Sequence, residues 1–450
     1  MHKPVPPISA CTNTPFNGSL NLANPTVAYN YSVQQAVSYA NPNMPATFGD
    51  VKYVGDDNYV DGSTCDVLPD AVDTCDNRIS NLVYDVYYPS NFNNYSTCPL
   101  PAVILFHAGG FMECSNYRSG GITTICAELA KRGYVAFSVE YRTGRIKDPI
   151  ATNTSVQQQL AAYRACQDAR GAIRSIIKRQ DNETTGDIWN DPYRINKDYI
   201  FVGGMSAGGV AAMNAAWYSN SMVYDVFQGG TGSAAIQQAL TSINADFYYG
   251  ESTITYQSNI KGTVSLWSAV NIPVYYDTHE YDFFNSSLLK PHIAFHGKKD
   301  DVFPYDDGSA QNVSFSPTPI SGPNIYNSED FCIRTNNGPF TLEGNAGTVD
   351  LINGSSLNMR NILSHYGIAN ELYVDCDMKH GLSSGGQFLG DFGVASNQNQ
   401  ANIYIAQRIA TFFQAVLSGN QGSIGTNYFP NCENTRNGCP AKTTSCTDCN

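Results

Sequence analysis

Charged residues are scarce in this chain of 450 residues. Asp, Glu, Lys and Arg make up 14% of it, whereas about a quarter is usual in soluble proteins. Asn, Ser, Thr, Gly and Tyr fill the polar positions instead, which is more typical of secreted than of cytosolic proteins. The sequence also lacks a cluster of Lys and Arg, and its formal net charge is −13. Both features argue against nucleic acid as a partner.

Long apolar runs are absent as well. No run approaches the roughly 18 residues of a membrane span. The first residues, MHKPVPPISAC, have no apolar core like that of a signal peptide. We therefore expect a mature or recombinant form from which any leader has been removed, and a secreted or periplasmic location.

Cysteine, in contrast, is plentiful. The chain contains 13 cysteines, a number that favours an oxidising compartment. Cys446 and Cys449 form a C-x-x-C pair near the C-terminus, but no histidine lies nearby, so disulfides are favoured over a metal site there. The odd count leaves at least one free thiol, and Cys166, in a helical pattern, is the buried candidate.

Apolar runs alternate with helical patterns through most of the chain. The predicted strands are residues 81–89, 100–106, 134–139, 199–202, 262–270, 291–295 and 371–376. The predicted helices are residues 122–132, 155–179, 210–218, 355–366 and 402–417. This alternation predicts parallel βαβ units, and hence an α/β three-layer sandwich with a mostly parallel central sheet.

Three segments fall outside this pattern. Residues 1–76 are predicted to be an N-terminal extension packed on the α/β domain, with one strand near residues 32–39. Within the domain, residues 77–418, the segment 306–354 is too long for an ordinary loop. It is either a cap over a functional site or a surface insertion. Residues 419–450 are predicted to be a linker and a Cys-rich tail.

Residues 196–218 combine a buried strand, a glycine-rich turn and a helix around Ser206. A serine at a sharp strand-to-helix turn lies in strained backbone, so its neighbours two positions away must lack a Cβ. Gly204 and Gly208 meet this need. The N-terminus of the helix directs free N–H groups and its positive dipole end toward the serine. This context predicts a nucleophile elbow, although the bare motif also occurs in ordinary turns.

The base that such a serine needs is expected among the seven histidines. In the order Ser, acid, His, only His365 and His380 come late enough. His365 lies inside a predicted helix, whereas His380 follows a strand and precedes Gly381 on a loop. We therefore predict His380 as the base.

The acid is expected just after the preceding strand, in the sequence HGKKDDVFP. Asp300 and Asp301 both qualify, and the motif position favours Asp300, where a carboxylate would hold the imidazole tautomer. His292 and His296 flank that strand and are expected to have packing or turn roles.

An oxyanion hole requires converging backbone N–H groups. The loop HAGGF follows a buried strand, so the amides of Gly109 and Gly110 are predicted donors, together with the amide of Ala207. His107 is expected to brace this loop. Phe111, Met205 and Trp267 are the predicted substrate-binding residues.

These motifs resemble those of the α/β-hydrolase superfamily, and within it of carboxylesterases like the bacterial feruloyl and acetyl-xylan esterases. The matching stretches, between residues 81 and 381, are NLVYDVYYP, HAGGF, VEYR, CQDARGAIRSI, NKDYIFVGGMSAGG, HGKKDDVFPY and KHG. Ala108 departs from the HGGG pattern, and Met205 stands where related esterases often carry Glu or Asp. The resemblance implies a secreted serine esterase that needs no metal or organic cofactor and acts on acetyl or feruloyl esters of plant polysaccharides.

Two alternatives stay open. The first is a short-chain carboxylesterase or a polyester hydrolase. A continuous apolar groove around Phe111 and Trp267 would favour a polyester hydrolase. A small closed pocket would favour an enzyme that acts on acetyl esters. The second, from another class, is a binding protein on an inactive α/β-hydrolase scaffold, because a fold alone does not prove activity.

Overall fold

The computed structural model describes part of the chain. The described residues are 30–40, 82–89, 99–111, 116–118, 121–141, 143, 154–181, 193, 195–218, 256–277, 280–283, 288–300, 302–303, 305, 325–326, 349–375, 378–382, 398–419 and 425–430. Most of the predicted extension, most of the segment 306–354 and the Cys-rich tail lie outside them, as does Asp301.

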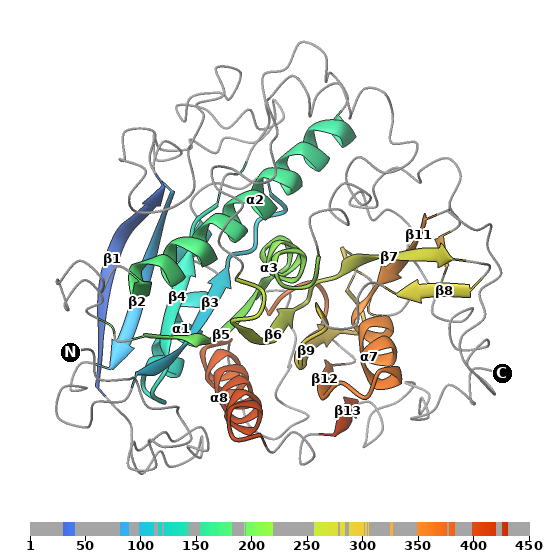
Figure 1. The fold of residues 1–450 in the computed structure, drawn as a ribbon. Coiled ribbons are helices and arrows are strands. Elements are labelled where there is room, and N and C mark those ends of the chain that lie inside the picture. The colour runs from blue at the N-terminus through green and yellow to red at the C-terminus, as the bar shows by residue number, and fades with distance from the viewer. Residues whose placement is uncertain are drawn as a thin grey trace.

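A mostly parallel sheet forms the centre of the described structure (Figure 1). Its strands are β1 (Tyr31–Ala40), β2 (Leu82–Pro89), β3 (Leu100–Phe106), β4 (Val135–Val139), β5 (Ile195–Met205), β6 (Ile260–Leu266), β9 (His292–Gly297), β12 (Asn370–Asp375) and β13 (Thr426–Pro430). They lie in the order β1-β2-β4-β3-β5-β6-β9-β12-β13. β2 pairs antiparallel with both of its neighbours, β1 and β4. Every pair from β4 to β13 is parallel.

Helices cover both faces of this sheet. They are α1 (Ile122–Ala130), α2 (Thr154–Asp181), α3 (Ala207–Trp217), α7 (Ser356–His365) and α8 (Gln398–Leu417), with a short 3-10 helix, η3 (Asn116–Arg118). One buried cluster joins the sheet to α2, α3 and α7, and a second joins it to α1 and α8. The predicted α/β three-layer sandwich is therefore confirmed.

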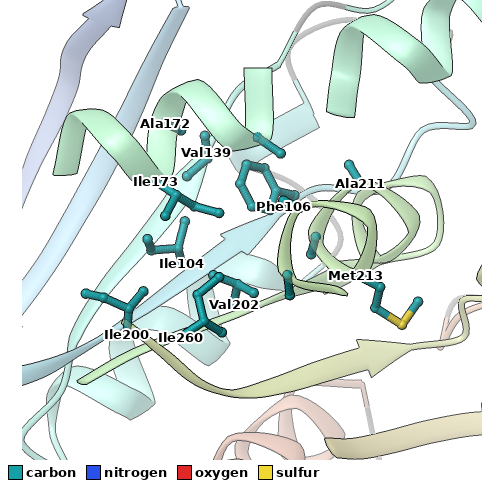
Figure 2. Close-up of a cluster of buried hydrophobic side chains, with 14 of the residues drawn as sticks. Ile104, Phe106, Val139, Ala172, Ile173, Ile200, Val202, Ala211, Met213 and Ile260 are labelled. Atoms are coloured by element: carbon teal, nitrogen blue, oxygen red, sulfur yellow. The ribbon is translucent and has the colours of Figure 1, made fainter. Parts of the chain in front are cut away.

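The strand β3 shows how a continuous apolar run builds both cores. Ile104 and Phe106 belong to the cluster under α2 and α3, whereas Val103 and Leu105 belong to the cluster under α1 and α8. Successive side chains of a strand point to opposite faces, so a strand buried on both sides must be apolar at every position. Figure 2 shows Ile104 and Phe106 among the side chains of the first cluster.

The long helix α2 also holds the end of α3. Arg170 is buried, and its Nη2 lies 2.7 Å from the carbonyl oxygen of Tyr218 and 3.4 Å from that of Asn214. Both carbonyls lie at the C-terminus of α3, where a helix has unpaired acceptors and its negative dipole end. This contact explains part of the CQDARGAIRSI stretch in the sequence.

A second, smaller sheet was not predicted. Its strands are β7 (Val270–Asp277), β8 (Glu280–Phe283), β10 (Ile325–Tyr326) and β11 (Val349–Gly354), in the order β10-β11-β7-β8. The strand expected over residues 262–270 ends at Leu266, and the chain then enters β7. The described part of the segment 306–354 therefore pairs with a hairpin from an earlier part of the chain, beside α7 (Figure 1).

The expected linker after residue 418 also differs from the structure. Thr426–Pro430 form β13, which pairs parallel with β12, with Asn370 opposite Thr426. The α/β domain therefore extends past the predicted boundary at residue 418. A strand that pairs only with a distant neighbour has a weak local signal, which explains the difference.

Among the described residues, Cys126 and Cys166 are both free and buried. Cys166 was the predicted free thiol, and Cys126, in α1, is an additional one. Burial raises the pKa of Cys166 to about 12, so this thiol stays protonated and unreactive near neutral pH. Neither residue bears on the oxidising compartment predicted from the other cysteines.

None of the described helices combines the length and the apolar character that a membrane-spanning segment requires.

Because His292, at the start of β9, is buried, we predict that the stability of the protein depends on pH. Its Nδ1 lies 2.8 Å from Thr263 Oγ1 and its Nε2 lies 3.1 Å from Ser265 Oγ. Burial lowers the pKa of His292 from 6.5 to about 3. Between these values the unfolded chain binds a proton that the folded chain does not bind. The contribution of His292 to the free energy of unfolding is therefore complete above pH 6.5, and it is lost as the pH falls toward 3.

We expect the free energy of unfolding of the wild type to fall between pH 6.5 and 4 more steeply than that of His292→Gln. Denaturant titrations at several pH values measure both slopes. The difference isolates His292, because the carboxylates that titrate in this range are common to both proteins. Parallel slopes would contradict the prediction.

Candidate active site

Five adjacent parallel strands, β3, β5, β6, β9 and β12, end at the same edge of the central sheet. Each predicted triad residue follows the end of one of them. Ser206 follows β5, Asp300 lies three residues after β9, and His380 lies five residues after β12. Ligand and catalytic sites of open parallel sheets form at this edge, because the loops from neighbouring strands converge there.

Ser206 joins β5 to α3 in strained backbone, with φ 51° and ψ −122°. Its amide donates to the carbonyl of Leu266 at 2.9 Å, and its own carbonyl accepts from the amide of Gly209 at 2.9 Å. These main-chain bonds hold the turn between the end of β6 and the first turn of α3. A conformation of this kind costs about 1–3 kcal/mol and persists only when its surroundings impose it.

The two glycines of the motif are required by close approaches of the backbone. A Cβ on Gly208 would lie 2.3 Å from the carbonyl oxygens of both Phe106 and His107, and a Cβ on Gly204 would lie 2.4 Å from the carbonyl carbon of Gly208. Main-chain atoms cannot give way as a flexible side chain can. The motif G-x-S-x-G therefore lets α3 pack directly against the end of β3.

The structure brings the three predicted triad residues together. His380 Nε2 lies 2.8 Å from Ser206 Oγ. On the other side of the ring, His380 Nδ1 lies 2.9 Å from Asp300 Oδ2 and 3.0 Å from Asp300 Oδ1. The Asp300 side chain is fully buried, and 21% of the His380 side chain is exposed. The imidazole therefore bridges a serine hydroxyl and a buried carboxylate.

Several donors surround the Asp300 carboxylate. Its Oδ1 accepts from the backbone amides of Val302 at 2.9 Å and Phe303 at 2.8 Å. His296 Nε2 lies 3.2 Å from Oδ2. Burial by itself raises the pKa of Asp300, but hydrogen bonds from His296 and His380 outweigh it and hold this pKa well below its usual value. Asp300 is therefore ionised at neutral pH, as a partner of an imidazole must be.

The loop after β3 has the backbone that an oxyanion hole needs. Gly109, Gly110 and Phe111 have φ values of 130°, 60° and 63°, so three successive residues turn in a left-handed sense. In the part of the chain that the structure describes, the amides of Gly109, Gly110 and Ala207 have no hydrogen-bond acceptor. Ala207 begins α3, where the first amides of a helix have no partner within the helix.

His107 is packed into this loop rather than directed at the serine. Its ring stacks on Tyr141, with 4.1 Å between ring centroids and 9° between planes. The Tyr141 hydroxyl donates to the carbonyl of His107 at 2.8 Å, and Glu140 Oε1 lies 3.4 Å from His107 Nε2. Glu140 and Tyr141 come from the VEYR stretch, which thus contacts the loop as the predicted brace requires.

The three predicted substrate-binding residues are all buried. Phe111, Met205 and Trp267 are 0%, 2% and 4% exposed. Phe111, Ser206 and Trp267 are also the non-glycine residues with positive φ among those described. Each lies where the chain leaves β3, β5 or β6, so backbone strain gathers around Ser206. A substrate contact for these side chains stays a prediction.

Sequence reasoning missed two contacts of the site. His296 was assigned a packing or turn role, but it faces Asp300. Ser268, two residues after β6, donates from Oγ to the carbonyl of Ser206 at 2.7 Å. The available signal for His296 was its place four residues before Asp300 in HGKKDD, where a short loop can return to the end of the strand.

This fold and this site define an α/β-hydrolase, and the protein is an ester hydrolase of that class. The chain belongs to the BD-FAE family, whose model matches residues 84–312, more than half of the sequence. The matched region includes Ser206 and Asp300 and ends before His380. The resemblance to carboxylesterases of the α/β-hydrolase superfamily is thereby confirmed.

Solved structures with similar folds are distant. MGS-M1, an α/β hydrolase from a Medee basin deep-sea metagenome library, is 16% identical, with a TM-score of 0.35, over 75% of this chain and 93% of its own. The butyrate-bound esterase Est2 from Thermogutta terrifontis is 14% identical, with a TM-score of 0.38, over 74% and 89%. At these values they carry no argument about substrates. Among curated proteins no significant match was found.

Proposed function

We propose that Ser206 is the nucleophile of an esterase, that His380 is its general base and acid, and that Asp300 orients His380. The single observation that supports these roles best is the position of the His380 ring. Its Nε2 is within hydrogen-bonding distance of Ser206 Oγ, and its Nδ1 is within the same distance of a buried, ionised carboxylate. A Ser-His-Asp triad is defined by this geometry and not by sequence position.

The reaction follows from the two ring nitrogens. Asp300 accepts the hydrogen bond from Nδ1–H, which leaves the lone pair of Nε2 directed at Ser206. As Ser206 Oγ attacks the ester carbonyl carbon, its proton passes to Nε2. His380 then gives that proton to the leaving alcohol oxygen, and the acyl group stays on Ser206. Water, deprotonated by the same nitrogen, then attacks the acyl carbon. The bond from that carbon to Ser206 Oγ breaks, His380 returns the proton to Oγ, and the acid is released.

The negative charge of each tetrahedral intermediate needs donors that are already in place. We assign the amides of Gly109, Gly110 and Ala207 to this role, because no described residue accepts a hydrogen bond from them and two chain segments bring them to the same sheet edge. Loss of one such donor typically costs about 10²–10³ in kcat. His107 and Tyr141 hold the loop that carries two of the three.

For the substrate, we propose acetyl or feruloyl esters of plant polysaccharides. The sequence motifs that resemble feruloyl and acetyl-xylan esterases support this class. The burial of Phe111 and Trp267 also speaks against a polyester substrate, because side chains that are 0% and 4% exposed cannot line an open apolar groove. A polysaccharide substrate fits the secreted or periplasmic location that we propose from composition and cysteine number.

Two measurements test this proposal. A fluorophosphonate probe should label Ser206, located by peptide mass, and labelling should end the hydrolysis of p-nitrophenyl acetate. A panel of acetylated xylan, methyl ferulate, p-nitrophenyl esters and aromatic polyester film then ranks substrates by kcat/KM. We expect the first two to lead. Faster release from the polyester would favour the polyester hydrolase, and the absence of labelling would favour an inactive binding scaffold.

A further inference from the structure

A second histidine contacts the proposed triad acid. His296 lies in β9, and its side chain is fully buried. Its Nε2 lies 2.7 Å from the carbonyl oxygen of Phe303 and 3.2 Å from Asp300 Oδ2. A carbonyl oxygen can only accept a hydrogen bond, so Nε2 must carry a proton. That N–H donates to the carbonyl oxygen of Phe303, and Asp300 Oδ2 lies 3.2 Å from the same nitrogen.

The opposite ring nitrogen is held as well. His296 Nδ1 lies 2.7 Å from the hydroxyl oxygen of Ser356, the first residue of α7. That hydroxyl also lies 3.4 Å from the carbonyl oxygen of Ser268, whose own hydroxyl donates to the carbonyl of Ser206. All these side chains are buried. A continuous set of contacts thus runs from the acid back to the main chain of the nucleophile.

The two serines of this network stand at the base of the smaller sheet. Ser268 lies between β6 and β7, where the chain enters that sheet, and Ser356 follows β11, where the chain leaves it. Their contact at 3.4 Å joins the two connections. The same pair of residues therefore supports the ring of His296 and ties the smaller sheet to the edge that carries the site.

We propose that His296 is a positioning residue for the acid, with Ser356 and Ser268 as its supports, and that the Phe303 carbonyl and Asp300 Oδ2 share its Nε2–H. This inference rests on the proposed role of Asp300 as the partner of His380. The amides of Val302 and Phe303 fix Oδ1. His296 restrains Oδ2, the oxygen that lies nearest to His380.

The donor from His296 also limits the charge that Asp300 presents to His380. A carboxylate with one donor fewer attracts a protonated imidazole more strongly, so the base would take up its proton at a higher pH. Apart from Asp300, the described contacts of His296 include one titratable group, Tyr305, whose ring centroid lies 6.3 Å away. Near His380, the carboxylate of Asp375 accepts from the amide of Met378.

Two substitutions separate this role from simple packing. His296→Phe keeps a ring but removes the donor, whereas His296→Gln can place an amide N–H near the position of Nε2. We expect His296→Phe to lower kcat roughly tenfold, the scale of one hydrogen bond to a charged group, and to move the acid limb of the kcat/KM profile to higher pH. His296→Gln should keep the limb near its wild-type position.

Rates are normalised to the number of sites that react with the fluorophosphonate, and folding is followed by circular dichroism. Failure of the wild type to label would sink the proposed function before His296 is tested. An unmoved acid limb in a folded His296→Phe, or equal shifts in both variants, would overturn the inference. If His296→Phe does not fold, Ser356→Ala is the deciding variant. A shift of its acid limb to higher pH supports the inference, and an acid limb at the wild-type pH overturns it.

Discussion

Ser206→Ala is expected to lower the turnover of p-nitrophenyl acetate by about five to six orders of magnitude, the scale seen when a triad nucleophile is removed. Alanine has no atom that can attack the ester, and His380 alone cannot form an acyl-enzyme. The fold should be unaffected, because the turn is held by main-chain hydrogen bonds to the carbonyl of Leu266 and from the amide of Gly209, which alanine preserves. Burst kinetics and steady-state rates measure the loss.

A matched control is Ser175→Ala, the same change at a buried serine in α2. It should retain turnover, and both variants should keep a melting temperature close to that of the wild type. Substantial residual activity in purified Ser206→Ala that resists a fluorophosphonate would rule out the nucleophile proposed above. A large drop in melting temperature for this variant would instead contradict the structural argument about the turn.

Asp300→Asn should lower kcat by about four orders of magnitude, as loss of the triad acid does elsewhere. Oδ1 accepts two backbone amides, from Val302 and Phe303. An asparagine would keep its carbonyl oxygen there, so its NH2 group would replace Oδ2. That donor would face His380 Nδ1, which must then lose its proton and leave Nε2 protonated. A protonated Nε2 cannot accept the proton of Ser206.

The control is Asp198→Asn, which makes the same change at an exposed position of β5. It should leave kcat unaltered. Because the damage in Asp300→Asn is to the tautomer of the base, KM should change far less than kcat. Near wild-type kcat in Asp300→Asn would show that the buried carboxylate does not orient His380.

The outcome for the strands shows why some elements could be predicted and others could not. β3 is a short apolar run and β9 has an apolar centre between two buried histidines. Their local pattern suffices because both faces are buried. β10 and β13 are two and five residues long. Such strands exist only through pairing with distant segments, so their sequences carry little sign of it.

The features of the site also fall into two groups, those that the sequence could predict and those that it could not. The order of Ser206, Asp300 and His380, each after a strand and beside tight turns, is a local property, and it was enough to propose the triad. The glycines at positions 204 and 208 were also predictable, because a sharp turn with a following helix leaves no room for a Cβ. The elbow and each loop that carries a triad residue could be recognised from residues within a few positions of one another, whereas the approach of Gly208 to Phe106 and His107 comes from the packed chain.

What the sequence by itself determined was therefore the class of fold, the elbow and the candidates for the triad. Only the tertiary structure decided that His296 faces Asp300, that Ser356 and Ser268 support it, and that the smaller sheet joins the site through these two serines. The physical reason is that a buried polar side chain must find its partner wherever the packed chain places one. That partner can lie 60 or 88 residues away, as it does for Ser356 with His296 and with Ser268.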